Sequence, residues 1–85
     1  MLHIISNPNA IEPCTRHLSE KDEIVFIGDG VYGLKGAKLD SRFPVYALET
    51  DLAARGITAT SNVTPASMAQ FVCLAVQHTS SVTWT

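Results

Sequence analysis

The sequence predicts an α/β fold built on a mainly parallel sheet of four to five strands, with helices in the connections. Ile24 to Ile27 is an uninterrupted apolar run, too short for a helix and without the alternation of a half-exposed strand, so it is typical of a strand buried on both faces. The turn Gly28-Asp29-Gly30 follows it directly. Other short apolar runs alternate with helical segments, and strands joined in this way form parallel sheets with right-handed crossovers.

The elements before this turn are a strand, a helix and the buried strand. The first strand covers Leu2 to Ser6 and is stopped by Asn7-Pro8-Asn9. A helix is expected from Ala10 to Leu18, with Pro13 near its first turn, where proline is tolerated. A polar turn then leads into the buried strand, which begins at Glu23.

A short helix and a third strand are expected after the turn. Asp29 is a natural cap for a helix over Val31 to Ala37, and Lys38 to Phe43 has the composition of a polar loop. The third strand is Val45 to Leu48. Because ligands of open α/β sheets gather at the carboxyl ends of the strands, we expect the working edge of the protein near Asp29.

Two more helices and two extended segments complete the expected fold. Thr50 caps a helix that Gly56 closes, with Asp51 in its first turn. Residues 57–63 are expected to be extended, and Thr64-Pro65 to cap and start the last helix. Helical spacing predicts one buried stripe along that helix: Met68, Phe71, Val72, Ala75 and Val76. Ser81 to Trp84 is a final strand.

Length and composition limit the classes of protein to which this chain could belong. The 85 residues predict a single domain, residues 1–85, and 46% hydrophobic content with a net charge of −2 favours an oligomer. Six scattered basic residues do not make an electrostatic surface for nucleic acid. The beginning of the chain has neither a basic segment nor a long apolar one, so a cytoplasmic protein is expected, without a signal peptide or a membrane span.

The two cysteines are the main candidates for chemistry, and they are too few for a metal quartet. If the first helix begins near Pro13, the thiol of Cys14 lies in its first turn, where the helix dipole favours a thiolate by about 0.3–1 kcal/mol. Arg16 or His17 could add to this effect. Such a thiolate suits a nucleophile that accepts sulfur as a persulfide; the alternative is a small apolar helix residue. Cys73 lies beside the apolar stripe of the last helix and is expected to be buried and structural.

The remaining candidates carry weaker signals. His3, His17 and His78 are dispersed and form no ligand pattern, and His3 is expected to be packed or hydrogen-bonded within its strand. Gly28-Asp29-Gly30 invites a phosphate-binding interpretation, but it lacks both the Lys-Ser/Thr of a P-loop and the third glycine of a dinucleotide fingerprint. A plain strand-to-helix turn is the better interpretation.

Taken together, these segments resemble the DsrH/TusB family of sulfur-relay proteins nearly end to end. The matching pieces, in order, are Leu2-His3, Asn7-Pro8, Ser19-Glu20, Asp29-Gly30-Val31, Val45-Tyr46-Ala47-Leu48, Asp51-Leu52-Ala53-Ala54-Arg55-Gly56, Phe71-Val72, His78 and Trp84. Single pieces are weak, but their order and spacing are specific. Residues 57–64 form a slightly shorter segment than in relatives.

The resemblance implies a small flavodoxin-like three-layer subunit that assembles with DsrE/TusD-like and DsrF/TusC-like subunits into a heterohexamer. In the Tus branch, such a complex passes persulfide sulfur to a downstream carrier and finally to 2-thiouridine at the tRNA wobble position; in the Dsr branch, related complexes act in sulfur oxidation. DsrH-type members carry a cysteine fifteen positions before the turn aspartate, which is the separation of Cys14 and Asp29 here. The resemblance therefore implies that Cys14 is the persulfide acceptor. Some TusB-type members lack this cysteine and are structural subunits.

Three hypotheses follow. In the first, the Cys14 thiolate attacks the outer sulfur of a donor persulfide, holds it and yields it to an acceptor cysteine, without a cofactor because sulfur moves by thiol exchange. In the second, the chain is a non-catalytic assembly subunit in which Cys14 is only packed. In the third, Gly28-Asp29-Gly30 belongs to a nucleotide-binding flavodoxin-like module, which we do not expect.

Overall fold

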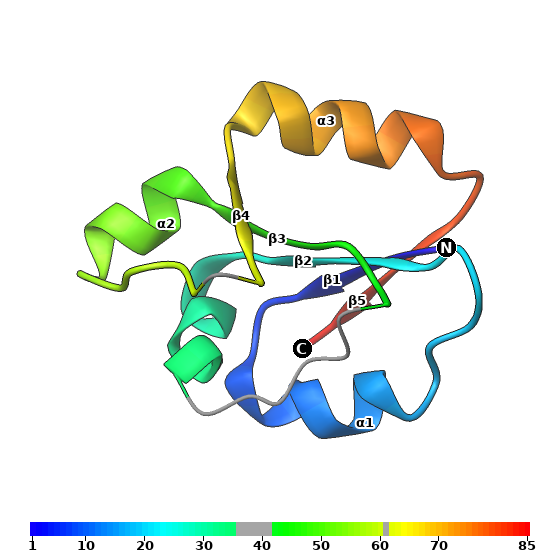
Figure 1. Cartoon of the computed structure of the whole chain (residues 1–85), viewed down its shortest axis with the longest axis horizontal. Helices are drawn as coiled ribbons and strands as arrows, with labels where there is room; N and C mark the ends of the chain where they lie inside the picture. The colour runs from blue at the N-terminus through cyan, green and yellow to red at the C-terminus, as the bar shows by residue number, and fades with distance from the viewer. Residues whose placement is uncertain (36–41, 61) are drawn as a thin grey trace.

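The computed structural model describes residues 1–35, 42–60 and 62–85, and within them five strands form one fully parallel sheet (Figure 1). The order across the sheet is β4-β3-β2-β1-β5. The strands are β1 (Leu2–Ile5), β2 (Glu23–Phe26), β3 (Val45–Leu48), β4 (Thr64–Ala66) and β5 (Ser81–Trp84). The predicted parallel α/β fold is confirmed.

The strand β2 occupies the centre of the sheet, as its apolar run predicts. Ile24, Val25 and Phe26 are all at most 1% exposed. Val25 pairs with Ile4 of β1 on one side and with Tyr46 of β3 on the other. A strand with neighbours on both edges and cover on both faces has no position left for a polar side chain, which explains the unbroken run.

Helices cover both faces of the sheet. The 3-10 helix η1 (Pro8–Ala10) leads directly into α1 (Ile11–Thr15), and η2 (Gly28–Lys35) follows β2. The helix α2 (Glu49–Ala54) follows β3, and α3 (Met68–Gln77) connects β4 to β5. The helices α1 and η2 lie on one face of the sheet and α3 lies on the other (Figure 1). Because β5 lies at the edge opposite β4, a right-handed connection places α3 on the opposite face from the earlier helices.

The close fit between η2 and β1 depends on a glycine. A side-chain carbon at Gly30 would lie 2.1 Å from the carbonyl oxygen of Ile5, so no other residue fits there without a backbone shift. The main core lies on this side of the sheet and contains Phe26, Val31 and Leu34. At the end of α2, Gly56 has a φ of +63° and closes the helix, as predicted.

Several helix boundaries differ from the expectation. The first helix is shorter than residues 10–18, and η2 already begins at Gly28, so Asp29 lies inside it and does not cap it. The helix α2 begins at Glu49, one residue before the expected cap Thr50, while Asp51 is in its first turn as predicted. Residues 36 and 37 at the end of the expected helix over 31–37, and most of the expected loop over 38–43, lie outside the described residues.

The fourth strand and the start of the last helix also differ. The strand is Thr64–Ala66, whereas residues 57–63 were expected to be extended and Thr64-Pro65 to begin the helix. Proline lacks an amide hydrogen, but an edge strand tolerates it, and β4 is an edge strand. The helix is capped instead by Ser67, whose side chain accepts from the amide of Gln70 while the Gln70 side chain accepts from the Ser67 amide.

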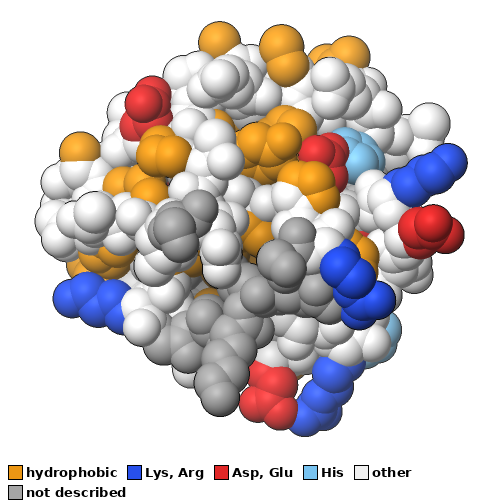
Figure 2. Space-filling view, in the orientation of Figure 1, with side chains coloured by type: hydrophobic (Ala, Val, Ile, Leu, Met, Phe, Trp, Pro, Cys, Tyr) orange, Lys and Arg blue, Asp and Glu red, His pale blue; other side chains and the backbone are white. Residues whose placement is uncertain are grey.

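The predicted buried stripe of α3 is wrong. Met68, Val72 and Val76 are 55%, 53% and 79% exposed, and Ala75 is also exposed. Leu74 is the buried residue of this helix, and Phe71 is half-buried against the same cluster. Apolar side chains stand out along the top of the molecule, where α3 runs (Figure 2). The helix is apolar on both sides, so the spacing of its apolar residues does not decide which side meets the sheet.

Candidate functional site

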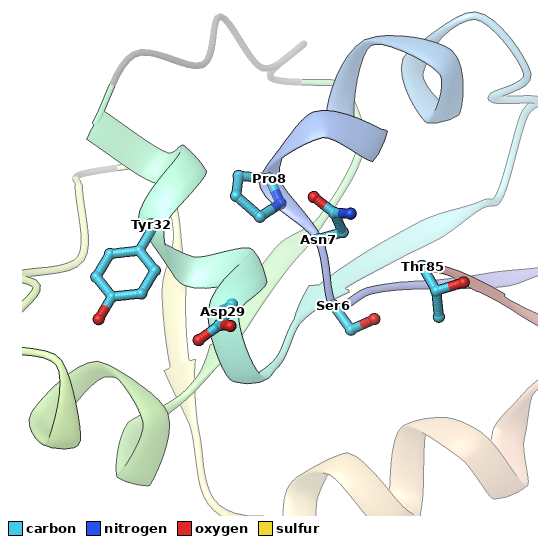
Figure 3. A pocket seen from close by; sticks show the side chains of 6 residues that line it. All are labelled: Ser6, Asn7, Pro8, Asp29, Tyr32 and Thr85. Carbon is cyan, nitrogen blue, oxygen red and sulfur yellow. The ribbon is translucent and has the colours of Figure 1, made fainter.

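A hollow lies at the carboxyl edge of the sheet, where the sequence predicted the working edge. It has a volume of about 430 Å³ and is lined by Ser6, Asn7, Pro8, Asp29, Tyr32 and Thr85 (Figure 3). These residues follow the ends of β1, β2 and β5. The side chain of Asn7 accepts a hydrogen bond from the amide of Asn9 at 2.9 Å, which turns the chain from β1 into η1. None of these six lining residues is a cysteine.

The side chain of Asp29 is tied to α2 by a charged cluster. Arg55 donates to Asp29 at 3.1 Å and pairs with Asp51 at 3.3 Å, and its guanidinium lies 5.8 Å from the centre of the Tyr32 ring. Asp51 also accepts from the backbone amide of Gly28 at 2.8 Å. This cluster was not predicted, although Asp51 lies four positions before Arg55, which is the spacing of a helical ion pair.

This cluster occupies two of the donors that a phosphate at the turn would use. The amide of Gly28 is already bonded to a carboxylate, and Arg55 is shared between two carboxylates. An incoming anion would therefore meet negative charge where a phosphate loop offers free amide groups. The arrangement favours the plain strand-to-helix turn over the nucleotide-binding interpretation.

Cys14 lies in the core and not in the hollow. It is the fourth residue of α1, its exposed fraction is 0%, and it packs in the cluster that contains Ile5 and Phe26. Burial, with a smaller effect of the Asp22 carboxylate, raises the pKa of the Cys14 thiol to about 11. The expected lowering of this pKa is therefore wrong, because desolvation outweighs the helix dipole.

The basic neighbours of Cys14 have other partners. Arg16 forms an ion pair with Glu12 on the exposed side of α1, and the ring of His17 bonds to the carbonyl of Pro13 at 2.9 Å. The helix also begins before Pro13, at Ile11, and η1 precedes it. The thiol consequently lies beyond the first exposed amides of the segment, where a dipole effect is smaller.

Cys73 is exposed, which contradicts the expectation of a buried cysteine. It lies on α3 beside a small hollow of about 220 Å³ that Tyr46, Thr64 and Pro65 also line. Both cysteines are free, and α1 and α3 lie on opposite faces of the sheet (Figure 1). The sheet separates the two thiols.

A buried network at the amino end of the sheet accounts for His3. The indole of Trp84 donates to Nδ1 of His3 at 3.1 Å, so the ring proton is on Nε2, which donates to Asp22 at 2.9 Å. Although burial acts to raise it, the pKa of Asp22 is lowered to about 2, because its carboxylate accepts from His3, from the Ser19 amide and from the terminal ammonium of Met1. The prediction that His3 is packed and hydrogen-bonded is confirmed.

Other kinds of site find little support in the part of the chain that the structure describes. Over residues 1–35, 42–60 and 62–85, histidine, cysteine and acidic side chains nowhere gather in a group of three or more that could hold a metal ion. Within the same ranges, each helix is too short or too polar to span a membrane.

Comparisons with known proteins agree with the resemblance seen in the sequence. The family model described as "DsrH like protein" matches residues 6–81. "Protein TusB" of Escherichia coli (strain SMS-3-5 / SECEC) is 38% identical over 77 residues, which cover 81% of either chain. "Protein TusB" of Shigella boydii serotype 18 is 36% identical over the same length and coverage. The match to the family model extends over most of the chain and includes the turn at Asp29. The chain therefore belongs to the DsrH/TusB family.

Proposed function

We propose that this chain is an assembly subunit of a cytoplasmic sulfur-relay complex that passes protein-bound persulfide sulfur towards 2-thiouridine at the tRNA wobble position. Membership in the DsrH/TusB family supports a place in such a relay. Its partners are DsrE/TusD-like and DsrF/TusC-like subunits in a heterohexamer, together with a downstream sulfur-carrier protein. The sulfur travels on cysteines of these partners.

The burial of Cys14 is the observation that favours the assembly role over the carrier role. Persulfide transfer needs a thiolate in contact with the outer sulfur of the donor, and the donor then leaves as a thiolate. With a thiol pKa of about 11, only about 0.03% of Cys14 is ionised at pH 7.5. The exposed fraction of 0% also leaves no path for a donor sulfur to the thiol.

Persulfide formation on Cys14 stays a prediction, and it requires α1 to move away from the sheet. Sulfur oxidation is the alternative to tRNA thiolation as the pathway served, because the Dsr branch of the family acts in sulfur oxidation. Genes for sulfite reductase beside this gene would favour that branch, and their absence beside DsrE-like and DsrF-like genes would favour tRNA thiolation.

Replacing Cys14 in the assembled complex tests the proposal. The chain is co-expressed with its DsrE-like and DsrF-like partners as wild type, as Cys14→Ser and, for a matched control, as Cys73→Ser. We expect the Cys14→Ser complex to form and to support normal 2-thiouridine levels in tRNA. Mass spectrometry of the three subunits should find persulfide on a partner and none on this chain. An intact Cys14→Ser complex without thiolation activity would establish the carrier role instead.

A further inference from the structure

A single tryptophan joins the last strand to the first strand and to α1. Trp84 is the only tryptophan of the chain, and it packs against the main core cluster, which contains Cys14. Its indole donates to Nδ1 of His3 on β1 at 3.1 Å, and the centres of the two stacked rings are 6.2 Å apart. The ring of His17, which follows α1, is centred 5.6 Å from the indole. The Trp84 side chain therefore lies where β5, β1 and the end of α1 meet.

The helix α1 depends on its packing because it is too short to be stable alone. It has five residues, and isolated helices shorter than about 12 residues are marginal in water. Cys14 is its buried residue, and Ile11, Leu18 and Trp84 are partly buried against the same core. Loss of the Trp84 contact would therefore loosen a segment whose buried group is the Cys14 thiol.

The hydrogen bonds of His3 are complete only while its ring is neutral. Nε2 donates to the Asp22 carboxylate at 2.9 Å, and Nδ1 accepts from the Trp84 indole. A second ring proton would lie on Nδ1 and point at the indole N–H, so that two donors would face each other and the bond to Trp84 would be lost. His3 is 2% exposed, so water cannot supply the missing acceptor while the network stays closed.

The other ionisable groups around His3 decide what protonation does. The Asp22 carboxylate accepts from His3 and, through its second oxygen, from the terminal ammonium of Met1 at 3.0 Å. On the side of α1, the neighbours of the network are the neutral Cys14 thiol and the ring of His17. Because the pKa of Asp22 is about 2, its carboxylate stays charged throughout the range in which histidines titrate. Asp22 therefore attracts a protonated His3, whereas the indole opposes it.

We propose that His3, Asp22 and Trp84 form a proton-operated latch that controls access to Cys14. At neutral pH the bond between His3 and the indole keeps the latch closed. In mildly acidic solution His3 takes up a proton from the solvent and keeps its bond to Asp22, while the Trp84 side chain turns away. The end of α1 then loses its support, and the thiol becomes accessible. This inference goes beyond the proposed function and does not depend on it, because the latch acts whether or not Cys14 carries sulfur.

Labelling of Cys14 in the full chain at two pH values tests the latch. The reagent is dithiodipyridine, an aromatic disulfide that reacts with thiols in mild acid. The rate in the native protein is divided by the rate in urea at the same pH, which removes the pH dependence of the reagent and of the free thiol. Exposed Cys73 is the internal reference. Quenching of the Trp84 fluorescence by acrylamide reports separately on whether the indole becomes accessible.

We expect the relative labelling rate of Cys14 to be about tenfold higher at pH 5.5 than at pH 7.5. Opening that takes up one proton becomes about tenfold more favourable per pH unit below about pH 6.5, where a free histidine titrates. The relative rate of Cys73 should change less than about twofold, since it is exposed in the closed form. Acrylamide quenching of Trp84 should increase over the same interval.

Three variants assign the pH dependence to the latch. His3→Asn keeps an oxygen that accepts from the indole but cannot be protonated, so the change with pH should disappear. His78→Asn is the matched control: His78 also bonds to a carboxylate, that of Glu23, but lies outside the latch, so the tenfold change should remain. Trp84→Phe removes the indole donor and leaves His3 titratable, so it should abolish the change even if His3→Asn does not fold. Circular dichroism at both pH values identifies the folded variants.

Several results would overturn the inference. One is an equal relative rate of Cys14 labelling at the two pH values in folded wild type. Another is a tenfold change that persists in folded Trp84→Phe. A change that is lost in His78→Asn and kept in His3→Asn would assign the pH dependence to the other face of the sheet and exclude the latch. None of these results decides the proposed function, which depends on the thiolation activity of the Cys14→Ser complex.

Discussion

The rates at which the two cysteines are alkylated measure how well the fold protects Cys14 from solvent. With a pKa of about 11, about 0.1% of the Cys14 thiol is ionised at pH 8, against about a quarter of an ordinary thiol with a pKa near 8.5. This difference alone predicts reaction with iodoacetamide about 200-fold slower than for an ordinary thiol. The exposed fraction of 0% slows it further, because the reagent must wait for α1 to open.

Cys73 serves as the internal standard because it is exposed in the same molecule. Peptide mass spectrometry after timed labelling should find Cys73 modified at least about 100-fold faster than Cys14 in the native protein, and both modified rapidly in urea. The Cys73→Ser variant repeats the measurement with Cys14 alone. Labelling of native Cys14 at the rate of Cys73 would refute the burial argument and restore the carrier hypothesis.

Three further substitutions test the fold. Gly30→Ala should lower the free energy of unfolding by about 3 kcal/mol in urea titrations, since its Cβ would meet the Ile5 carbonyl oxygen at 2.1 Å; a loss under about 1 kcal/mol would contradict this. Asp22→Asn should cost about 2 kcal/mol at pH 7. The carboxylate contributes its full stability above its unfolded pKa near 4, and this contribution is lost as pH falls through its folded pKa of about 2. The difference between the two proteins should therefore shrink from about pH 5 downward and disappear only below pH 2; a pH-independent difference would contradict the ionic origin. Ser67→Ala should cost about 1 kcal/mol through the lost helix cap, and an unchanged urea midpoint would show that the cap contributes nothing.

The sequence was sufficient for four strands of the sheet, β1, β2, β3 and β5, because strand signals are local. The run ending at Phe26 predicts a central strand, and that strand has neighbours on both sides. The strand Val45–Leu48 and the C′ glycine Gly56 are at their predicted positions for the same reason. The strand β4 was missed because Thr64-Pro65 is also a good helix start, and only the sheet reveals that this segment is an edge, where the missing amide hydrogen of Pro65 costs little.

The candidate site was predicted less well, because exposure depends on tertiary packing. The helix dipole is only one contribution to the pKa of Cys14, and desolvation, the larger one, depends on how the sheet covers α1. Asp29 lies at the carboxyl edge of the sheet, as expected because parallel strands end together, and a functional role for this edge stays a prediction. The pairing of Asp29 with Arg55 was not predicted, because it brings residues 26 positions apart into contact. No local pattern encodes that contact.

The two errors about burial have one physical explanation. The residue to which family resemblance assigns chemistry, Cys14, is in the core, and the residues that helical spacing assigns to the core, such as Val72, are on the surface. A chain of 85 residues has a limited interior, so it can bury one helix face fully only by leaving another uncovered. Here Cys14 of α1 is buried in the main core, and the apolar side of α3 made by Met68, Val72 and Val76 is exposed. A chain that hides its thiol and exposes apolar side chains on α3 fits the assembly role that we propose for it in a sulfur relay.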